Sequence, residues 1–69
     1  MAHIRNESVF ILHPSTQQAI QNACANADID NVVAVYQYSN EDNHIFDIYD
    51  EDENYQFSID TDGDIIFEK

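Results

Sequence analysis

Residues 44–60 read HIFDIYDEDENYQFSID, and this stretch decides the fold. In its two halves, His44–Asp50 and Asn54–Asp60, apolar and polar residues alternate with a period of two, as in strands with one buried face. The acidic segment between them, residues 51–53, is long enough only for a turn. We therefore expect the two strands to pair antiparallel as a hairpin.

Further strands are predicted on both sides of this hairpin. Val32–Tyr38 is rich in β-branched and aromatic residues, and the polar residues 39–43 that follow favour a turn. After Asp60, the dipeptide Asp62-Gly63 is typical of a two-residue type I′ turn, and Asp64–Glu68 then forms the last strand. The connections are too short for crossovers, so these four strands are expected to form an antiparallel meander.

One helix is predicted before the meander. Ser8–Leu12 has the composition of a short strand, and Pro14 ends it. Ser15 followed by Gln18 matches a capping box, which predicts a helix from about Thr16 to Ala27. The helix has one narrow apolar stripe, formed by Ile20, Ala23, Cys24 and Ala27.

Together these elements predict a single α+β domain over residues 1–69, with one helix packed on an antiparallel β-sheet of four to five strands in the order β-α-β-β-β-β. A hydrophobic content of 43% is enough for a core. Because aromatic side chains favour burial, the residues expected to face the helix are Phe46, Ile48, Tyr55, Phe57 and Ile59. Those expected on the solvent face are Ile45, Asp47, Tyr49, Gln56, Ser58 and Asp60.

The charge is large and unevenly distributed. The chain has 14 acids against 2 Lys or Arg, a net charge of −12, and all of the excess lies after residue 27. Direct binding to nucleic acid or to an anionic membrane needs clustered basic residues, and the chain has only Arg5 and Lys69. Asp28 and Asp30 follow the predicted helix, where the helix dipole disfavours negative charge, so helix stability does not explain them.

Catalytic and metal sites are not expected. Asp60, Asp62 and Asp64 alternate as in a calcium loop, but Ile65 occupies the position at which an EF-hand requires Gly. His3, His13 and His44 lack the spacing of a metal site, and Cys24 is expected on the buried helix stripe. We therefore predict no enzyme activity, no metal and no cofactor. A single cysteine and the lack of a long apolar run favour the cytoplasm.

The acidic residues themselves are the remaining candidate site. Side chains on one face of a strand repeat every 6.6–6.8 Å or so, whereas DNA carries a phosphate about every 3.4 Å along each strand. Two adjacent strands and their acidic turns approach that density, which predicts a surface that imitates DNA and binds a basic protein. The residues predicted to bind the partner are Asp47, Tyr49, Asp50, Glu51, Asp52, Glu53, Asp60, Asp62 and Asp64. A solvated acidic face and halophilic adaptation are the simpler interpretations.

In size, acidity and β-rich pattern the whole chain resembles the small phage-encoded anti-CRISPR proteins that act as DNA mimics. This resemblance implies a non-catalytic inhibitor in the bacterial cytoplasm that occupies the DNA-binding or PAM-reading surface of a type I CRISPR effector. The sequence is compatible with either a monomer or a small homodimer.

A second resemblance concerns residues 15–66. The helix and the meander that ends in Tyr55–Asp60 and Asp62–Ile66 are similar to PepSY-like domains. This resemblance implies an inhibitory or structural protein-binding module that uses apolar edge-strand or sheet contacts, with acidity serving solubility or halophilic adaptation.

Overall fold

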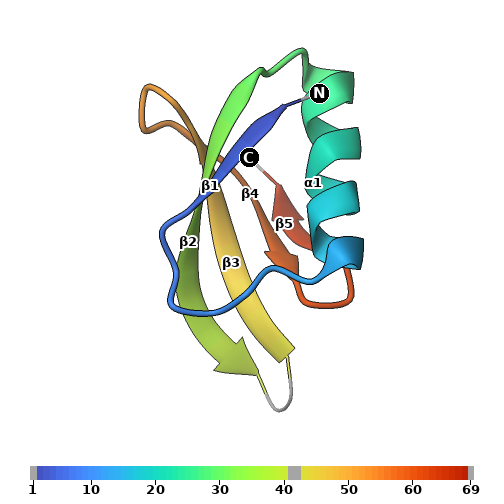
Figure 1. Ribbon diagram of the computed structural model, residues 1–69, viewed down its shortest axis with the longest axis vertical. Coiled ribbons are helices and arrows are strands. Elements are labelled where there is room, and N and C mark those ends of the chain that lie inside the picture. The colour runs from blue at the N-terminus through green and yellow to red at the C-terminus, as the bar shows by residue number, and fades with distance from the viewer. Residues whose placement is uncertain (1, 41–42, 69) are drawn as a thin grey trace.

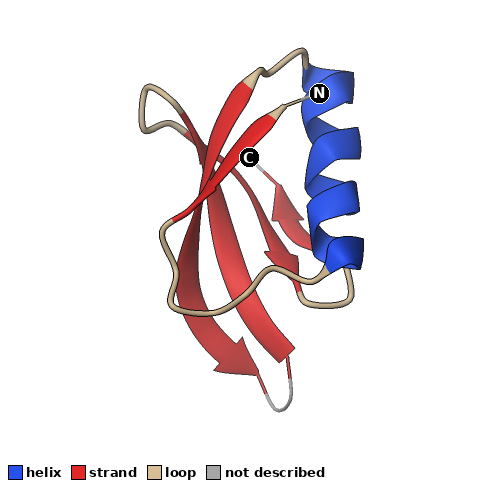
Figure 2. Cartoon of the chain, viewed as in Figure 1, coloured by secondary structure: helices blue, strands red, loops and turns tan. Residues whose placement is uncertain are grey.

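The computed structural model describes residues 2–40 and 43–68, which form one helix and five strands. In chain order these elements are β1 (His3–Asn6), α1 (Pro14–Ala27), β2 (Asn31–Asn40), β3 (Asn43–Asp50), β4 (Tyr55–Asp60) and β5 (Ile65–Glu68). The strands lie side by side in the order β1-β2-β3-β4-β5, and α1 packs along one face of the sheet (Figures 1 and 2). The predicted α+β architecture and element order are confirmed.

One strand pair departs from the predicted antiparallel sheet. β1 runs parallel to β2, with His3 opposite Asn31 and Asn6 opposite Ala34. The segment between the two strands contains the whole of α1, which is long enough to carry the chain back to the same end of the sheet. The other three pairs are antiparallel, as the short connections predict.

The prediction of a strand at Ser8–Leu12 was wrong, because the first strand lies at His3–Asn6. Local side-chain hydrogen bonds bend the chain after β1, since Asn6 Oδ1 accepts the Ser8 N–H and Ser8 Oγ accepts the Phe10 N–H. Such bonds compete with strand pairing. Val9 and Ile11 consequently point to solvent, with 92% and 85% of their surface exposed.

The helix begins two residues earlier than predicted, and it begins without the predicted capping box. Pro14 occupies the first turn and His13 is the N-cap, with no side-chain capping hydrogen bond. Pro at this position has a backbone angle already suited to a helix. The predicted end at Ala27 is confirmed, and there Asp28 adopts a left-handed conformation with φ 59° while the Ile29 N–H donates to the Cys24 carbonyl.

The core lies between α1 and the sheet. Ile20 and Cys24 from the helix are fully buried, as predicted, and Thr16 joins them in place of Ala27, which is exposed. The sheet residues buried in this core are Val32, Ala34, Phe46, Ile48, Phe57 and Ile59. Four of these are the Phe and Ile residues predicted to face the helix on the central hairpin.

Tyr55 does not face the helix, contrary to prediction. The pairing shifts between Ile48, which lies opposite Phe57, and Tyr49, which lies opposite Tyr55, so Gln56 is an extra residue in β4. Because a bulge adds one residue to a strand, the residues beyond it lie on the opposite face from the one that simple alternation predicts. Tyr55 therefore shares the far face with Asp47 and Ser58, and Gln56, expected on that face, lies on the side of the helix near Ala23 and Phe57.

The turn at Asp62-Gly63 also differs from the predicted type I′ turn. Gly63 N–H donates to the Asp60 carbonyl and Asp60 N–H to the Asp64 carbonyl, so the loop has three residues, of which Gly63 has φ 89°. This is a type I turn followed by a left-handed residue. The close approach of the helix also favours Gly here, because a Cβ would lie 3.0 Å from the Ser15 carbonyl oxygen.

Candidate functional site

The predicted binding residues do not form one continuous surface. Successive turns of an antiparallel meander lie at opposite ends of the sheet, so residues 50–53 are at one end and residues 60–64 at the other (Figure 1). Asp47 and Tyr49 lie between them on the face opposite α1. Of the turn predicted at residues 39–43, residues 41 and 42 lie outside the described residues, and residues 39, 40 and 43 belong to β2 and β3.

The β3–β4 turn is joined by two acids from elsewhere in the chain. Asp28 and Asp30 line a hollow of about 410 Å³ together with Asp50, Glu51 and Asp52. The two segments are linked by a hydrogen bond of 3.5 Å from Asn31 Nδ2 to Glu51 Oε2. We call this group of acids the acidic pole, and it consists of Asp28, Asp30, Asp50, Glu51, Asp52 and Glu53. Five of the six are exposed, and Asp50 is half-buried.

Asp50 holds the turn of the acidic pole in shape. Its Oδ1 accepts the backbone N–H groups of Asp52 and Asn54, each at 2.9 Å, and its Oδ2 accepts Gln56 Nε2 at 3.3 Å. Asp and Asn side chains commonly stabilise turns through such bonds. The carboxylates of Glu51, Asp52 and Glu53 are therefore displayed on a braced turn, and Asp50 serves mainly to brace it.

The β4–β5 turn repeats this arrangement. Asp60 Oδ1 accepts the N–H groups of Asp62 and Asp64 at 3.0 and 2.9 Å. One carboxylate oxygen from each of these three aspartates lies within 4.8 Å of the others. Two of the three carboxylates are exposed, and exposed acidic groups are often close together without an ion, so we assign no metal to the turn.

The sheet face opposite α1 carries a row of aromatic rings. The centroids of Tyr49 and Tyr55 are 5.8 Å apart, and those of Tyr55 and Phe67 are 6.0 Å apart. Ser58 Oγ donates to Asp47 Oδ1 at 2.6 Å, so its oxygen is left to accept the Tyr55 hydroxyl. We call this the open sheet face, because no helix among the described residues lies against it (Figure 2).

One residue of the open sheet face is buried. Ile45 was expected to face solvent, and it does lie on this side, but only 2% of its surface is exposed. It shares a hollow of about 370 Å³ with side chains that include Tyr38, Tyr55 and Phe67. The face is therefore partly apolar, unlike the predicted acidic surface.

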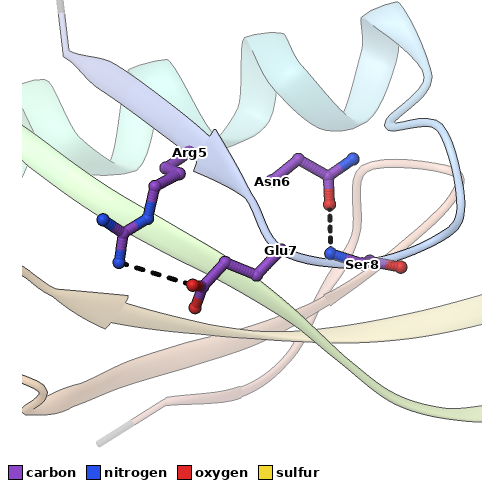
Figure 3. Close-up of polar contacts among 4 residues, drawn as sticks. All are labelled: Arg5, Asn6, Glu7 and Ser8. Carbon is purple, nitrogen blue, oxygen red and sulfur yellow. Dashed lines mark hydrogen bonds and ion pairs between the residues drawn. The ribbon is translucent and has the colours of Figure 1, made fainter.

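A larger cleft, of about 710 Å³, lies where the open sheet face meets the acidic pole. Val33, Val35 and Tyr49 contribute apolar groups to its lining, and the turn at residues 50–53 forms one rim. Arg5 and Glu7 form the other rim, where Arg5 Nη2 and Glu7 Oε2 are 3.6 Å apart (Figure 3). This is the only ion pair among residues 2–40 and 43–68, and both side chains are more than half exposed.

The outer strand β5 is unusually apolar for a sheet edge. Ile65, Ile66 and Phe67 have 39%, 51% and 63% of their surface exposed. Within the described chain only β4 pairs with β5, so the backbone groups along its other side lack a strand partner. Exposed apolar edges of this kind favour pairing with another chain.

The surroundings of Cys24 and His44 indicate a role in packing. Burial raises the pKa of the Cys24 thiol, so the reactive thiolate is disfavoured. The ring of His44 stacks on Phe10, with centroids 4.0 Å apart, and its buried Nδ1 has no hydrogen-bond partner. Both residues contribute to packing around the core.

Comparisons of this chain with protein-family models, with curated proteins and with solved structures give no match. Within the described residues, no helix has the length and apolar character needed to cross a membrane.

Proposed function

We propose that the protein is a non-catalytic inhibitor whose acidic pole occupies the basic, nucleic-acid-binding surface of another protein. The observation that carries this proposal is the gathering of six carboxylates from two chain segments at one end of the molecule. Two adjacent acidic segments provide a higher charge density than one strand, as imitation of a phosphate backbone requires.

Preorganisation supports the same proposal. The turn at residues 50–53 is braced by the hydrogen bonds of Asp50, and Asp28 belongs to the hydrogen-bonded end of α1. Carboxylates held on short turns lose less conformational entropy on binding than those on a flexible tail. Complementary charge also accelerates association with a basic surface.

The target that we propose is the DNA-binding or PAM-reading surface of a type I CRISPR effector in the bacterial cytoplasm. The support for this target is the resemblance in size, acidity and strand content to anti-CRISPR DNA mimics. The protein would act there as a competitor of target DNA, without cofactor or catalysis.

The test compares two matched charge reversals. Glu51→Lys with Asp52→Lys alters the acidic pole and leaves the bracing Asp50 intact, whereas Asp62→Lys with Asp64→Lys makes the same charge change at the opposite end and leaves Asp60 intact. Competition with target DNA for the purified effector is measured at low and high salt. We expect the first variant to lose about tenfold or more in affinity, and the second to lose much less.

If the variant with Glu51→Lys and Asp52→Lys still inhibits, and its circular dichroism is unchanged, the proposal is contradicted. Equal losses in the two variants would show that only net charge matters. Wild-type affinity should fall with added salt, because the interaction is proposed to be ionic.

The exposed residues of β5 favour a second candidate, a PepSY-like module that binds its partner through apolar strand contacts. Phe67→Lys would then abolish partner binding, the acidic-pole variant would not, and affinity would be nearly independent of salt.

A further inference from the structure

We propose that the cleft between the open sheet face and the acidic pole binds arginine side chains of the basic partner, with Tyr49 as the surface on which the guanidinium group stacks. This inference rests on the proposed function, because one rim of the cleft belongs to the acidic pole.

The cleft lining has an apolar part suited to an aliphatic stem. Val33 and Val35 on β2 and Tyr49 on β3 are only half-buried, on a side of the sheet that no helix of the described chain covers. The three methylene groups of an arginine side chain can lie along such a surface while the charged head reaches the rim.

Tyr49 is also held in place for stacking. Its ring meets that of Tyr55 edge to face, with an interplanar angle of 74° and centroids 5.8 Å apart. The Tyr55 hydroxyl is in turn bonded to Ser58, which donates to Asp47. A cation over the face of a tyrosine ring is attracted by the electrons of the ring, and arginine is the cation found there most often.

Charge complementarity identifies the occupant. Five acids line the cleft, namely Glu7, Asp50, Glu51, Asp52 and Glu53, whereas its basic lining consists of Arg5 and His3. Arg5 is already engaged with Glu7, which shows the contact that an incoming arginine would make with the opposite rim (Figure 3). A second copy of this chain would bring another net charge of −12 to the cleft, so like-charge repulsion opposes it.

Arginine fits this surface better than lysine does. Its planar guanidinium group stacks on aromatic rings, binds carboxylates through two hydrogen bonds and is more weakly hydrated than an ammonium group. The acidic rim attracts both cations, so a preference for arginine measures the contribution of the aromatic and apolar lining.

The test is a titration of the isotope-labelled protein with two synthetic probes, followed by NMR. One is a six-residue peptide that alternates arginine with valine, and the other has lysine in place of arginine. We expect the arginine peptide to bind about three- to fivefold more tightly. Its largest shift changes should fall on Val33, Val35 and Tyr49.

Two variants separate ring stacking from apolar burial. Tyr49→Phe keeps an aromatic ring and should keep the preference for arginine, whereas Tyr49→Leu should make the two peptides bind equally. If Tyr49→Leu fails to fold, Val35→Lys serves instead, because it places a positive charge in the cleft and should weaken both peptides.

Equal affinity of the two peptides for the wild type, with shifts confined to residues 28–30 and 50–53, would overturn this inference and leave the proposed function standing. Binding of neither peptide would contradict the proposed function itself. A dimer in sedimentation of the protein alone, with protection of Tyr49, would assign the cleft to a second copy and also overturn the inference.

Discussion

The hydroxyl group of Thr16 donates to the backbone carbonyl oxygen of Thr61 at 2.9 Å and also lies 3.1 Å from that of Asp60. Thr16 is fully buried in the first turn of α1, and both carbonyls belong to the end of β4 and the turn that follows. One buried polar group therefore attaches the start of the helix to a turn that is 45 residues away in the chain.

Thr16→Val should destabilise the fold by about 0.5–1.5 kcal/mol, because valine has nearly the same shape but cannot make the hydrogen bond of the buried hydroxyl, while the two carbonyls keep their other donors, Ser15 Oγ and the Gly63 N–H. Urea unfolding followed by circular dichroism measures the change. Ser15→Ala is the control, since Ser15 makes an exposed bond of 3.2 Å to the same Thr61 carbonyl and should cost less. Equal stability of Thr16→Val and the wild type would show that the bond makes no net contribution.

Glu53→Gly should stabilise the protein by about 0.5–1 kcal/mol. Glu53 has φ 67°, in the left-handed region that costs an ordinary residue roughly 1–2 kcal/mol, and Gly63 occupies the equivalent position of the β4–β5 turn. Glu53→Gln removes the charge but retains the strain, so thermal unfolding of both variants separates the two effects. A gain in Glu53→Gln as large as that in Glu53→Gly would assign the effect to charge.

Moderate NaCl should raise the melting temperature. The described residues contain a single ion pair, Arg5 with Glu7, and it is exposed, so salt screens mainly the repulsion among acids. Differential scanning fluorimetry over a range of NaCl concentrations provides the measurement. A fall in melting temperature would mean that the carboxylates already have stabilising partners in the fold.

The free energy of unfolding should decrease above pH 9, in part because the thiol of Cys24 ionises there when unfolding exposes it. Burial raises the pKa of the thiol from its ordinary value of 9.0, so the folded protein favours the protonated form. The resulting contribution to stability is complete below that value and is lost as the pH rises towards the folded-state pKa. Cys24→Ala should show a smaller decrease over the same pH range in urea unfolding, and parallel curves for the two proteins would contradict this account.

The central hairpin shows how far local pattern predicts this fold. The alternation in His44–Asp50 and Asn54–Asp60 correctly predicted two strands and the burial of Phe46, Ile48, Phe57 and Ile59, because burial of one sheet face imposes a period of two. The same alternation failed at Tyr55, since a bulge depends on how two strands pair and not on either strand alone.

The first strand was missed for a related reason. Residues 3–6 contain one aliphatic side chain, Ile4, and β1 is held by backbone pairing with β2, which no side-chain pattern reports. Ser8–Leu12 had the stronger strand composition, but the hydrogen bonds of Asn6 and Ser8 bend the chain there.

The candidate site, like the fold, was predictable from the sequence only in part. The sequence by itself determined which residues are acidic, that many of them lie in or beside turns, and that one helix would pack on a meander, because turn chemistry and periodicity act over a few residues. Only the tertiary structure decided which acids are neighbours. Residues 50–53 lie far from residues 60–64, because consecutive turns of a meander lie at opposite ends of the sheet. Asp28 and Asp30 lie close to residues 50–53, because the end of α1 lies beside the β3–β4 turn.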